Sequence, residues 1–316
     1  MAPGTPFIAH LPPSPAITEG WAPLLPPSAQ TNPVIPRTFM DAMRVRDQVY
    51  VQEQSVPIEN EFDADDARCC HWVIYASVRK VVEHEVRSEA NSAIIVRPRR
   101  SESYSLPIGT IRLVPFPHAA PHPVRGGIYV ADKLVGMLPA AESNPSTPSP
   151  DQQSSNRPSP TAAAAAAAAG RRQRSSSLLT HPFSVDRATA FHDGVEPYVK
   201  LGRLAVLKEF RGAGIASQLV HEAIDWMRKH PTFFNPSVAA LGFEQLGMED
   251  NSHGLGRDVP PKWRGLICCH AQESAVKVWA KHGFQVDESM GKWTEEGIPH
   301  VGMFLRVPLT PETPQV

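Results

Sequence analysis

The segment from Tyr198 to His230 constrains the fold of this chain more than any other, because it encodes a strand, a turn and a helix in direct succession. Residues 198–206 are apolar or β-branched often enough to predict a buried strand. Gly212 and Gly214 follow and mark a tight turn. From residue 215 onward, apolar side chains recur at three- and four-residue spacing, which predicts an amphipathic helix with its charged residues on the opposite face.

The glycine turn before this helix is suited to binding an anion. The first turn of a helix leaves backbone N–H groups without partners, and the positive end of the helix dipole adds to their attraction for phosphate. Arg211 places a full positive charge beside them. The run RGAGIA at 211–216 is neither the G-x-G-x-x-G of dinucleotide-binding folds nor a P-loop, which requires Gly-Lys-Ser/Thr. We therefore predict a phosphate site that neither motif describes.

The run RGAGIA resembles the Arg/Gln-x-x-Gly-x-Gly/Ala signature of the GCN5-related N-acetyltransferase (GNAT) superfamily, which holds the pyrophosphate of acetyl-coenzyme A. Other segments of the chain resemble further parts of the same family, in the family's order. These segments are RVRDQVYVQEQSVPIENEFDADD at 44–66, HAQESAVKVWAKHGF at 270–284 and GIPHVGM at 297–303. The resemblance implies an α/β fold with a mixed, splayed β-sheet flanked by helices, and a cofactor bound in the splay.

The resemblance also implies an activity. The family's members transfer an acetyl group from acetyl-CoA directly to an amine, here expected to be the primary amine of a small molecule, without a covalent enzyme intermediate. Such a reaction needs a phosphate cradle, a backbone donor for the thioester oxygen and a base for the ammonium proton. The resemblance assigns cofactor binding to Arg211, Gly212, Ala213, Gly214, Ile215 and Ala216 at the pyrophosphate, to Leu204, Ala205 and Val206 as backbone donors, and to Gln272 at the pantetheine arm.

The residues that transfer protons depart from the family pattern. Many members carry a glutamate on the central strand, but the equivalent positions here hold Lys200, Gly202 and Arg203. The tyrosine that usually meets the leaving thiolate is replaced by Trp279, whose indole N–H cannot give up a proton at neutral pH. We therefore expect catalytic proton transfer from positions that most members do not use.

The remaining candidates for proton transfer are Glu53, Glu61, Asp63 and His300. We predict Glu53 and His300 as the catalytic residues, because both lie in segments that match the family. A histidine titrates in the range that either role requires, and burial or neighbouring charge can bring a glutamate near neutrality. The acidic run at 59–66 fits two interpretations, a solvated turn or a negative mouth for a cationic amine.

Two other functions stay open at this stage. Disordered flanking segments could dock other proteins, which makes a protein-lysine acetyltransferase the alternative within the enzyme class. A non-catalytic acyl-CoA-binding module also fits, because the central strand carries no carboxylate. The sequence does not identify the acceptor amine.

Proline-rich and low-complexity segments surround and interrupt one domain. Proline makes up 33 of 316 residues, about twice the roughly 5% of average usage. Residues 1–36 hold ten prolines and predict a disordered tail. We expect a single N-acetyltransferase domain at 37–309, with a low-complexity insertion at 138–180, a polar insertion at 231–262 and a tail at 310–316. The tail at 1–36 and the insertion at 138–180 are expected to be dispensable for folding and activity.

Charge and composition bound the partners and the compartment. A formal net charge of −1 gives no field to attract nucleic acid or an anionic membrane, and no run approaches the ~18 apolar residues of a membrane span. We expect a small amine as the partner and leave the oligomeric state open. Four cysteines fit an intracellular, reducing setting. That setting is cytoplasmic, or nuclear if an import receptor reads the basic-serine run RRQRSSS at 171–177.

The cysteines occur in two Cys-Cys-His triplets, at 69–71 and 268–270, which suggests a zinc site. Neighbouring residues on a strand point to opposite faces, so each triplet presents at most two ligands together. Structural zinc sites instead use C-x-x-C loops. We therefore expect four buried strand cysteines, Cys69, Cys70, Cys268 and Cys269, and no metal.

Overall fold

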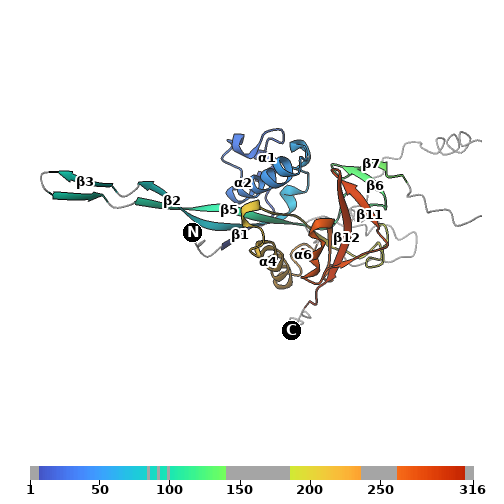
Figure 1. Cartoon of the computed structure of the whole chain (residues 1–316). Coiled ribbons are helices and arrows are strands. Elements are labelled where there is room, and N and C mark those ends of the chain that lie inside the picture. The colour runs from blue at the N-terminus through green and yellow to red at the C-terminus, as the bar shows by residue number, and fades with distance from the viewer. Residues whose placement is uncertain are drawn as a thin grey trace, which may run out of the picture.

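A computed structural model describes residues 7–83, 86–90, 93–97, 100–139, 186–235 and 262–309. Among these residues the strands form a ten-stranded mixed sheet in the order β1-β2-β5-β8-β9-β12-β11-β6-β7, with β10 paired to β12, and a separate hairpin β3-β4 (Figure 1). The strands are β1 Phe7–Leu11, β2 Cys70–Glu83, β3 Val86–Ala90, β4 Ala93–Arg97, β5 Arg100–Val114, β6 Gly127–Val130, β7 Lys133–Met137, β8 Val199–Val206, β9 Leu266–Gln272, β10 Gln285–Val286, β11 Lys292–Glu295 and β12 Ile298–Arg306.

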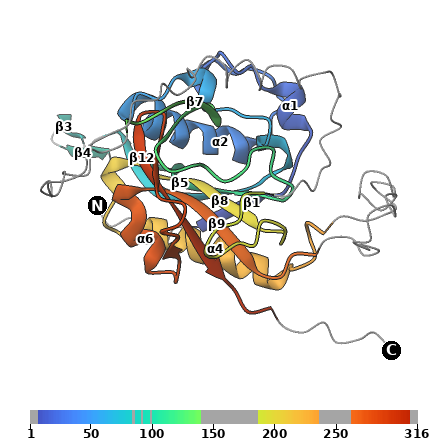
Figure 2. The same ribbon diagram turned by 90° about the vertical axis from the view of Figure 1, so that its right-hand side faces the viewer.

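Helices cover both faces of this sheet (Figure 2). They are α1 Ala16–Gly20, α2 Arg37–Arg46, α4 Ile215–Lys229 and α6 Val276–Ala280. A π-helical segment at Asp47–Glu53 continues α2, and short 3₁₀ turns lie at Pro27–Ala29, Ile58–Asn60, Asp66–Arg68, Lys208–Phe210 and Glu273–Ala275. None of the described helices is both long and apolar enough to cross a membrane.

The sheet is splayed between β8 and β9. These two strands pair in parallel only from Val199 to Leu201, opposite Ile267 to Cys269. Further along, β8 stays bonded to β5 and β9 stays bonded to β12. Among the described residues, the edge of β8 after Leu201 therefore has no paired strand on the side of β9. This arrangement confirms the mixed, splayed α/β sheet flanked by helices.

The strand, turn and helix expected at 198–230 are present as β8 and α4, and α4 packs as its periodicity indicates. Its apolar positions Leu219 and Ala223 are fully buried in one cluster with Trp72 of β2 and Leu113 of β5. The helix α2 covers the opposite face, where Ala42 packs against Val73 and Tyr75 of β2. The two helices thus hold β2, β5 and β8 between them.

The expectation that residues 1–36 form a disordered tail is wrong for the part that the structure describes. Strand β1 pairs antiparallel with β2, from Phe7 opposite Tyr75 to Leu11 opposite His71. Ile17 and Trp21 are buried against Phe39 of α2. The prolines lie largely between these contact points, where they stiffen the connections without interrupting a hydrogen-bonded ladder. Proline content therefore predicted disorder wrongly for this segment, because a few apolar side chains are enough to pack it against the core.

Strands β2 and β5 remain paired as far as Glu83 and Arg100 and form an arm that projects from the body (Figure 1). The expected insertions lie largely outside the described residues. The insertion at 138–180 lies outside the described residues except for its first two positions. The insertion at 231–262 is described only at 231–235 and at 262, and the tail at 310–316 also lies outside.

Buried charges occupy the acidic loop that precedes β2. Each of its inward-facing carboxylates contacts a guanidinium that is itself buried or nearly so, so the loop is not a free negative mouth. The contacts run from Arg46 to Glu61 at 2.5 Å and to Asp66 at 2.7 Å, from Arg112 to Asp63 and Asp66 at 2.8 Å each, and from Arg203 to Asp63 at 3.2 Å. Glu61 and Asp63 are therefore paired and less suited to act as a base.

His71 beside this network makes the fold sensitive to acid. Its ring is buried, and its Nε2–H donates to the backbone carbonyl of Asp66 at 2.8 Å. Burial lowers the pKa of His71 to about 4, whereas an unfolded histidine titrates near ~6.5. Between these two pH values the unfolded state binds a proton that the folded state does not. The contribution of neutral His71 to the free energy of unfolding is therefore complete above pH ~6.5 and is lost as the pH falls toward 4.

Between about pH 6.5 and 4, we expect the free energy of unfolding to decrease less in His71→Gln than in the wild type, by up to roughly 3 kcal/mol. Urea unfolding at both ends of this range measures the effect. His221→Gln, on the exposed face of α4, serves as the control. Equal pH dependence in His71→Gln and the wild type would contradict the prediction.

Candidate functional site

A cleft of about 530 Å³ lies where β8 and β9 separate. It runs from the turn before α4, along the open edge of β8, to the ends of β9 and β12. All of the residues predicted to bind the cofactor line this cleft except Ala213; they are Leu204, Ala205, Val206, Arg211, Gly212, Gly214, Ile215, Ala216 and Gln272. These predicted cofactor-binding residues, which span 69 residues of sequence, therefore line one continuous cleft.

The turn before α4 has the geometry of an anion cradle. Gly212 and Gly214 adopt left-handed backbone angles, with φ of 79° and 77°, which favour glycine over other residues. A Cβ at either position would meet no atom within 4 Å, so the space in front of both glycines is open. Among the described residues, no side chain caps the N-terminus of α4. The first N–H groups of a helix have no acceptor within the helix itself.

Arg211 is held at the mouth of this cradle. Its Nε–H donates to the carbonyl of Val206 at 2.9 Å, which orients the guanidinium. Both terminal nitrogens donate to the Glu53 carboxylate, at 2.6 and 2.7 Å. The hydrogen bonds from Arg211 are the first cause of the lowered pKa of Glu53. A carboxylate therefore occupies the donors that a phosphate would need.

A bulge re-aims the backbone of β8 inside the cleft. Thr110 lies opposite Ala205 while Arg112 lies opposite Gly202, so the two residues 203 and 204 face a single residue of β5. Arg203 has a φ of 49°, in the left-handed region that a non-glycine residue rarely adopts. Bulges of this kind redirect backbone groups next to functional sites.

Tyr50 supports the bulge, and the sequence analysis did not single it out. Its hydroxyl donates to the carbonyl of Leu204 at 3.0 Å, across 154 residues of sequence. Burial raises the pKa of Tyr50. Local spacing carried no signal for this contact, because its partner belongs to another element.

The other end of the cleft is polar. Gln272, at the end of β9, exchanges two hydrogen bonds with Gln54, at 2.9 and 3.3 Å between amide nitrogens and oxygens. Trp279 of α6 is 3% exposed and lines the same wall. Its indole N–H cannot supply a proton at neutral pH.

The two catalytic candidates lie at different places. His300 of β12 lines the cleft, whereas Glu53 is not among the described residues that line it and is bound to Arg211 instead. The Ile298 carbonyl lies 2.8 Å from His300 Nδ1. A carbonyl only accepts, so Nδ1 carries the hydrogen and Nε2 keeps a lone pair. This tautomer is the one that a general base requires.

Acidic side chains from the hairpin between β11 and β12 add negative charge to this end. Glu295 and Glu296 both line the cleft, as does Asp132 from the turn between β6 and β7. The Glu296 carboxylate accepts a hydrogen bond from the Ala131 N–H at 2.7 Å and from Asn60 at 3.2 Å. The turn consists of Glu296 and Gly297, both at positive φ. The Glu-Gly pair between two apolar runs is a hairpin signal that the sequence reasoning could have used.

The class of protein follows from this geometry and from sequence comparison. The model of the acetyltransferase (GNAT) family matches residues 183–247, which include β8, the glycine turn and α4. Residues 183–247 therefore match the GNAT family, as the resemblance of the RGAGIA run predicted. No curated protein sequence matches the chain significantly.

Solved structures similar to this one include three bacterial proteins. A Lactobacillus plantarum protein described as an N-acetyltransferase shares 15% identity, with a TM-score of 0.39, and the match covers 96% of this chain and 99% of that one. Escherichia coli ElaA shares 12%, with a TM-score of 0.38 and coverages of 95% and 99%. An acyl-CoA N-acyltransferase from Pseudomonas aeruginosa shares 11%, with a TM-score of 0.37 and coverages of 96% and 100%.

Proposed function

We propose that this protein transfers an acetyl group from acetyl-CoA directly to the primary amine of a small molecule. The observation that carries the proposal is the single cleft that joins a cationic cradle at Arg211 to an acidic end at Glu295 and Glu296. An anionic cofactor and a cationic acceptor would then enter from opposite ends. Their reacting groups would meet beside the bulge of β8.

The cofactor would bind with its pyrophosphate on the 211–216 turn. Helix N–H groups, the helix dipole and Arg211 supply the attraction. The pantetheine arm would extend along the open edge of β8, pairing with Leu204, Ala205 and Val206 in the manner of an added strand. Gln272 would contact the arm from β9. The match of residues 183–247 to the family model supports this placement.

The reaction would use His300 as the base. His300 Nε2 accepts a proton from the ammonium group, and the amine nitrogen then attacks the thioester carbonyl carbon. Backbone N–H groups of the β8 bulge stabilise the resulting oxyanion. The nitrogen releases its second proton to water as the carbon–sulfur bond breaks, and the CoA thiolate leaves with the proton returned by His300. Trp279 supplies no proton to this step.

The acidic hairpin supports an amine as the acceptor. A protonated amine entering beside Glu295 meets a carboxylate for which the structure gives no hydrogen-bond or ion-pair partner among the described residues. The charge of that carboxylate would attract the ammonium ion and hold it near His300. Protein lysine is the alternative acceptor, and acyl-CoA binding without turnover is the alternative function.

An amine screen distinguishes these functions. Release of free CoA from acetyl-CoA is measured across small primary amines and lysine-containing peptides. We expect turnover with small amines; turnover only with peptides would replace them by protein lysine. No turnover with any acceptor, together with tight binding of acetyl-CoA in calorimetry, would indicate a binding module. Unchanged acetyl-CoA affinity in a folded Gly214→Val variant would contradict the cofactor placement.

Glu53 acts against cofactor binding in this arrangement. Its carboxylate holds Arg211 in the cofactor-free state, so pyrophosphate must displace it. We expect Glu53→Gln to tighten acetyl-CoA binding about 1.5- to 5-fold, the worth of one exposed ion pair. Calorimetry measures the change, and Glu288→Gln, which removes the same charge from an exposed position outside the cleft, is the control. Weaker binding in Glu53→Gln would show that Glu53 positions Arg211 for the cofactor.

A further inference from the structure

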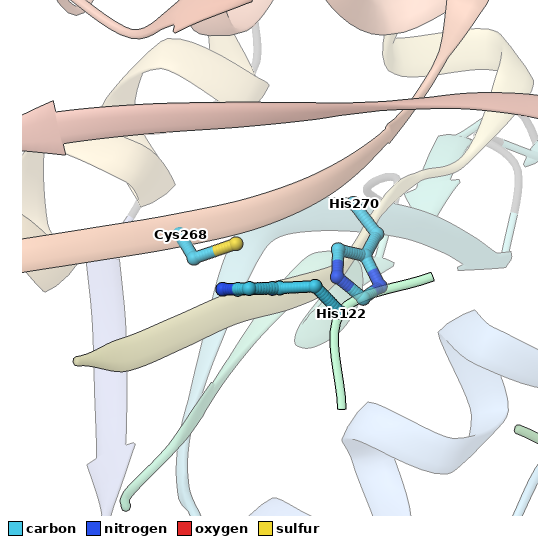
Figure 3. Close-up of side chains that lie close together, drawn as sticks. All are labelled: His122, Cys268 and His270. Carbon is cyan, nitrogen blue, oxygen red and sulfur yellow. The ribbon is translucent and has the colours of Figure 1, made fainter. Parts of the chain in front are cut away.

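A cluster of metal-ligating side chains lies outside the reaction described above. His122 comes from the loop before β6, and Cys268 and His270 both come from β9 (Figure 3). Each residue offers one ligand atom, and these three atoms lie within 4.8 Å of one another. His122 is 2% exposed and Cys268 is fully buried.

Strand alternation explains why β9 contributes two members of the cluster. Cys268 and His270 are two residues apart, so their side chains stand on the same face of the sheet. Cys269 points to the opposite face and packs in the core beneath α4. The triplet at 268–270 therefore presents two ligands together, as the sequence indicated, and the third comes from a loop that the sequence places 146 residues earlier.

Both histidines of this cluster keep a ring nitrogen without a partner. His122 Nδ1 and His270 Nε2 are buried and make no hydrogen bond among the described residues. A buried polar atom without a hydrogen bond is costly, and such atoms are rare in native proteins. A ligand that binds these nitrogens would remove that cost.

The other nitrogen of His122 is already held. His122 Nε2 lies 3.0 Å from His192 Nδ1 and 3.6 Å from the Asp186 carboxylate. Metal-binding histidines typically use the second nitrogen in this way, because a carboxylate or other acceptor fixes the ring orientation. His122 therefore has the environment of a ligand with its supporting partners in place.

We propose that His122, Cys268 and His270 form a binding site for a thiophilic divalent cation of the zinc type. Imidazole nitrogen and thiolate sulfur are the donors that zinc prefers. A tetrahedral zinc site would bring the donor atoms to about 3.4–3.6 Å from one another, so small side-chain rotations from the present separation suffice. Three protein ligands leave one position for a water molecule.

Nearby charges are compatible with the site. Burial lowers the pKa of His122 to about 4 and that of His270 well below its usual value, so both rings are neutral and able to ligate. Burial raises the pKa of the Cys268 thiol, so binding must release a proton. Lys200 also lowers the pKa of His270 and opposes a cation, whereas the Asp186 carboxylate raises the pKa of His122 and favours one.

The other histidine and cysteine groups are less suitable. His71, in the triplet at 69–71, is already bonded to the Asp66 carbonyl. The group His122–Asp186–His192 has its polar atoms engaged: His192 Nε2 lies 2.8 Å from the Glu196 carbonyl, and Asp186 accepts from the Tyr198 hydroxyl at 2.9 Å. The site at Cys268 joins the His122 loop to β9, and His270 also lines the cleft. The proposed metal site does not rest on the proposed acyl transfer.

Cobalt and zinc titrations of the full-length protein test the proposal. The protein is stripped with a chelator and then titrated with Co²⁺, and a thiolate-to-cobalt absorption band reports cysteine ligation. Zn²⁺ affinity is measured by competition with a chromogenic chelator. Cys268→Ala is compared with Cys269→Ala, a matched control because both thiols are fully buried, adjacent and on opposite faces.

We expect the wild type and Cys269→Ala to bind one cation with the thiolate band. We expect Cys268→Ala to lose the band and at least about 100-fold in zinc affinity. If the stripped wild type binds no stoichiometric metal, or if Cys268→Ala binds as tightly as Cys269→Ala, the proposal is overturned. Should Cys268→Ala fail to fold, His270→Asn replaces it with zinc affinity as the reading, and an affinity equal to that of Cys269→Ala overturns the proposal.

Discussion

Replacing His300 by alanine will lower the turnover number by about 10²–10⁴-fold on an identified amine, which is the usual contribution of general acid–base catalysis. The ring lines the cleft, and its Nδ1–H is fixed on the Ile298 carbonyl at 2.8 Å. Nε2 is therefore left to accept the ammonium proton. Acetyl-CoA affinity should change little, because His300 lies at the proposed acceptor end and Arg211 would hold the phosphates.

Single-turnover kinetics and calorimetry separate these effects on His300. Loss of turnover with unchanged acetyl-CoA affinity assigns the residue to the chemical step, and His221→Ala, on the exposed face of α4, controls for the loss of a histidine. A pH profile adds a second reading, because the variant should regain activity at high pH, where the amine is already neutral. Near-full turnover at neutral pH would mean that the amine loses its proton directly to solvent.

Replacing Arg46 by methionine will reduce the free energy of unfolding by about 3–5 kcal/mol, the usual cost of removing one partner of a buried ion pair. The Arg46 side chain is 1% exposed and contacts Glu61 and Asp66, which are buried as well. Burial by itself raises the pKa of Asp66, but the Arg46 and Arg112 guanidiniums lower it by more, so the pKa lies well below its usual range. Without Arg46, the carboxylates outnumber the guanidiniums in the network.

Arg44→Met is the matched control for Arg46. Arg44 lies on the same helix, but its side chain is 52% exposed. Its partner Asp41 is buried and keeps the Tyr75 hydroxyl at 3.1 Å and Arg37 at 3.6 Å, so the loss should stay below about 1 kcal/mol. Arg46→Lys keeps the charge without the guanidinium geometry and should fall between the two. Equal midpoints for Arg44→Met and Arg46→Met in urea unfolding would show that the network contributes no net stability.

Local patterns predicted the central part of the site. The spacing of apolar residues after Gly214 marked α4, and the glycines marked a turn whose positive φ angles the structure confirms. The strand at 198–206 followed in the same way, whereas the splayed sheet was expected from the family resemblance. Period and turn chemistry depend on neighbouring residues, so they can be read from the sequence.

Partnerships between distant segments could not be read in this way. The residues around Glu53 carry no pattern that predicts the contact of its carboxylate with Arg211, 158 residues later. The same is true of Tyr50 and Leu204, and of His122, whose loop meets the Cys268 face of β9.

The sequence by itself determined that this chain would build a strand, a glycine turn and a helix, because hydrophobic period and backbone conformation are local properties. Only the tertiary structure decided that residues 7–36 would fold, since their few apolar side chains gain stability by packing against Phe39 and by pairing with β2. It also decided which charges would be paired and which ring nitrogens would be left without a partner. Burial and hydrogen bonding depend on what the path of the chain brings together, and composition does not encode that path.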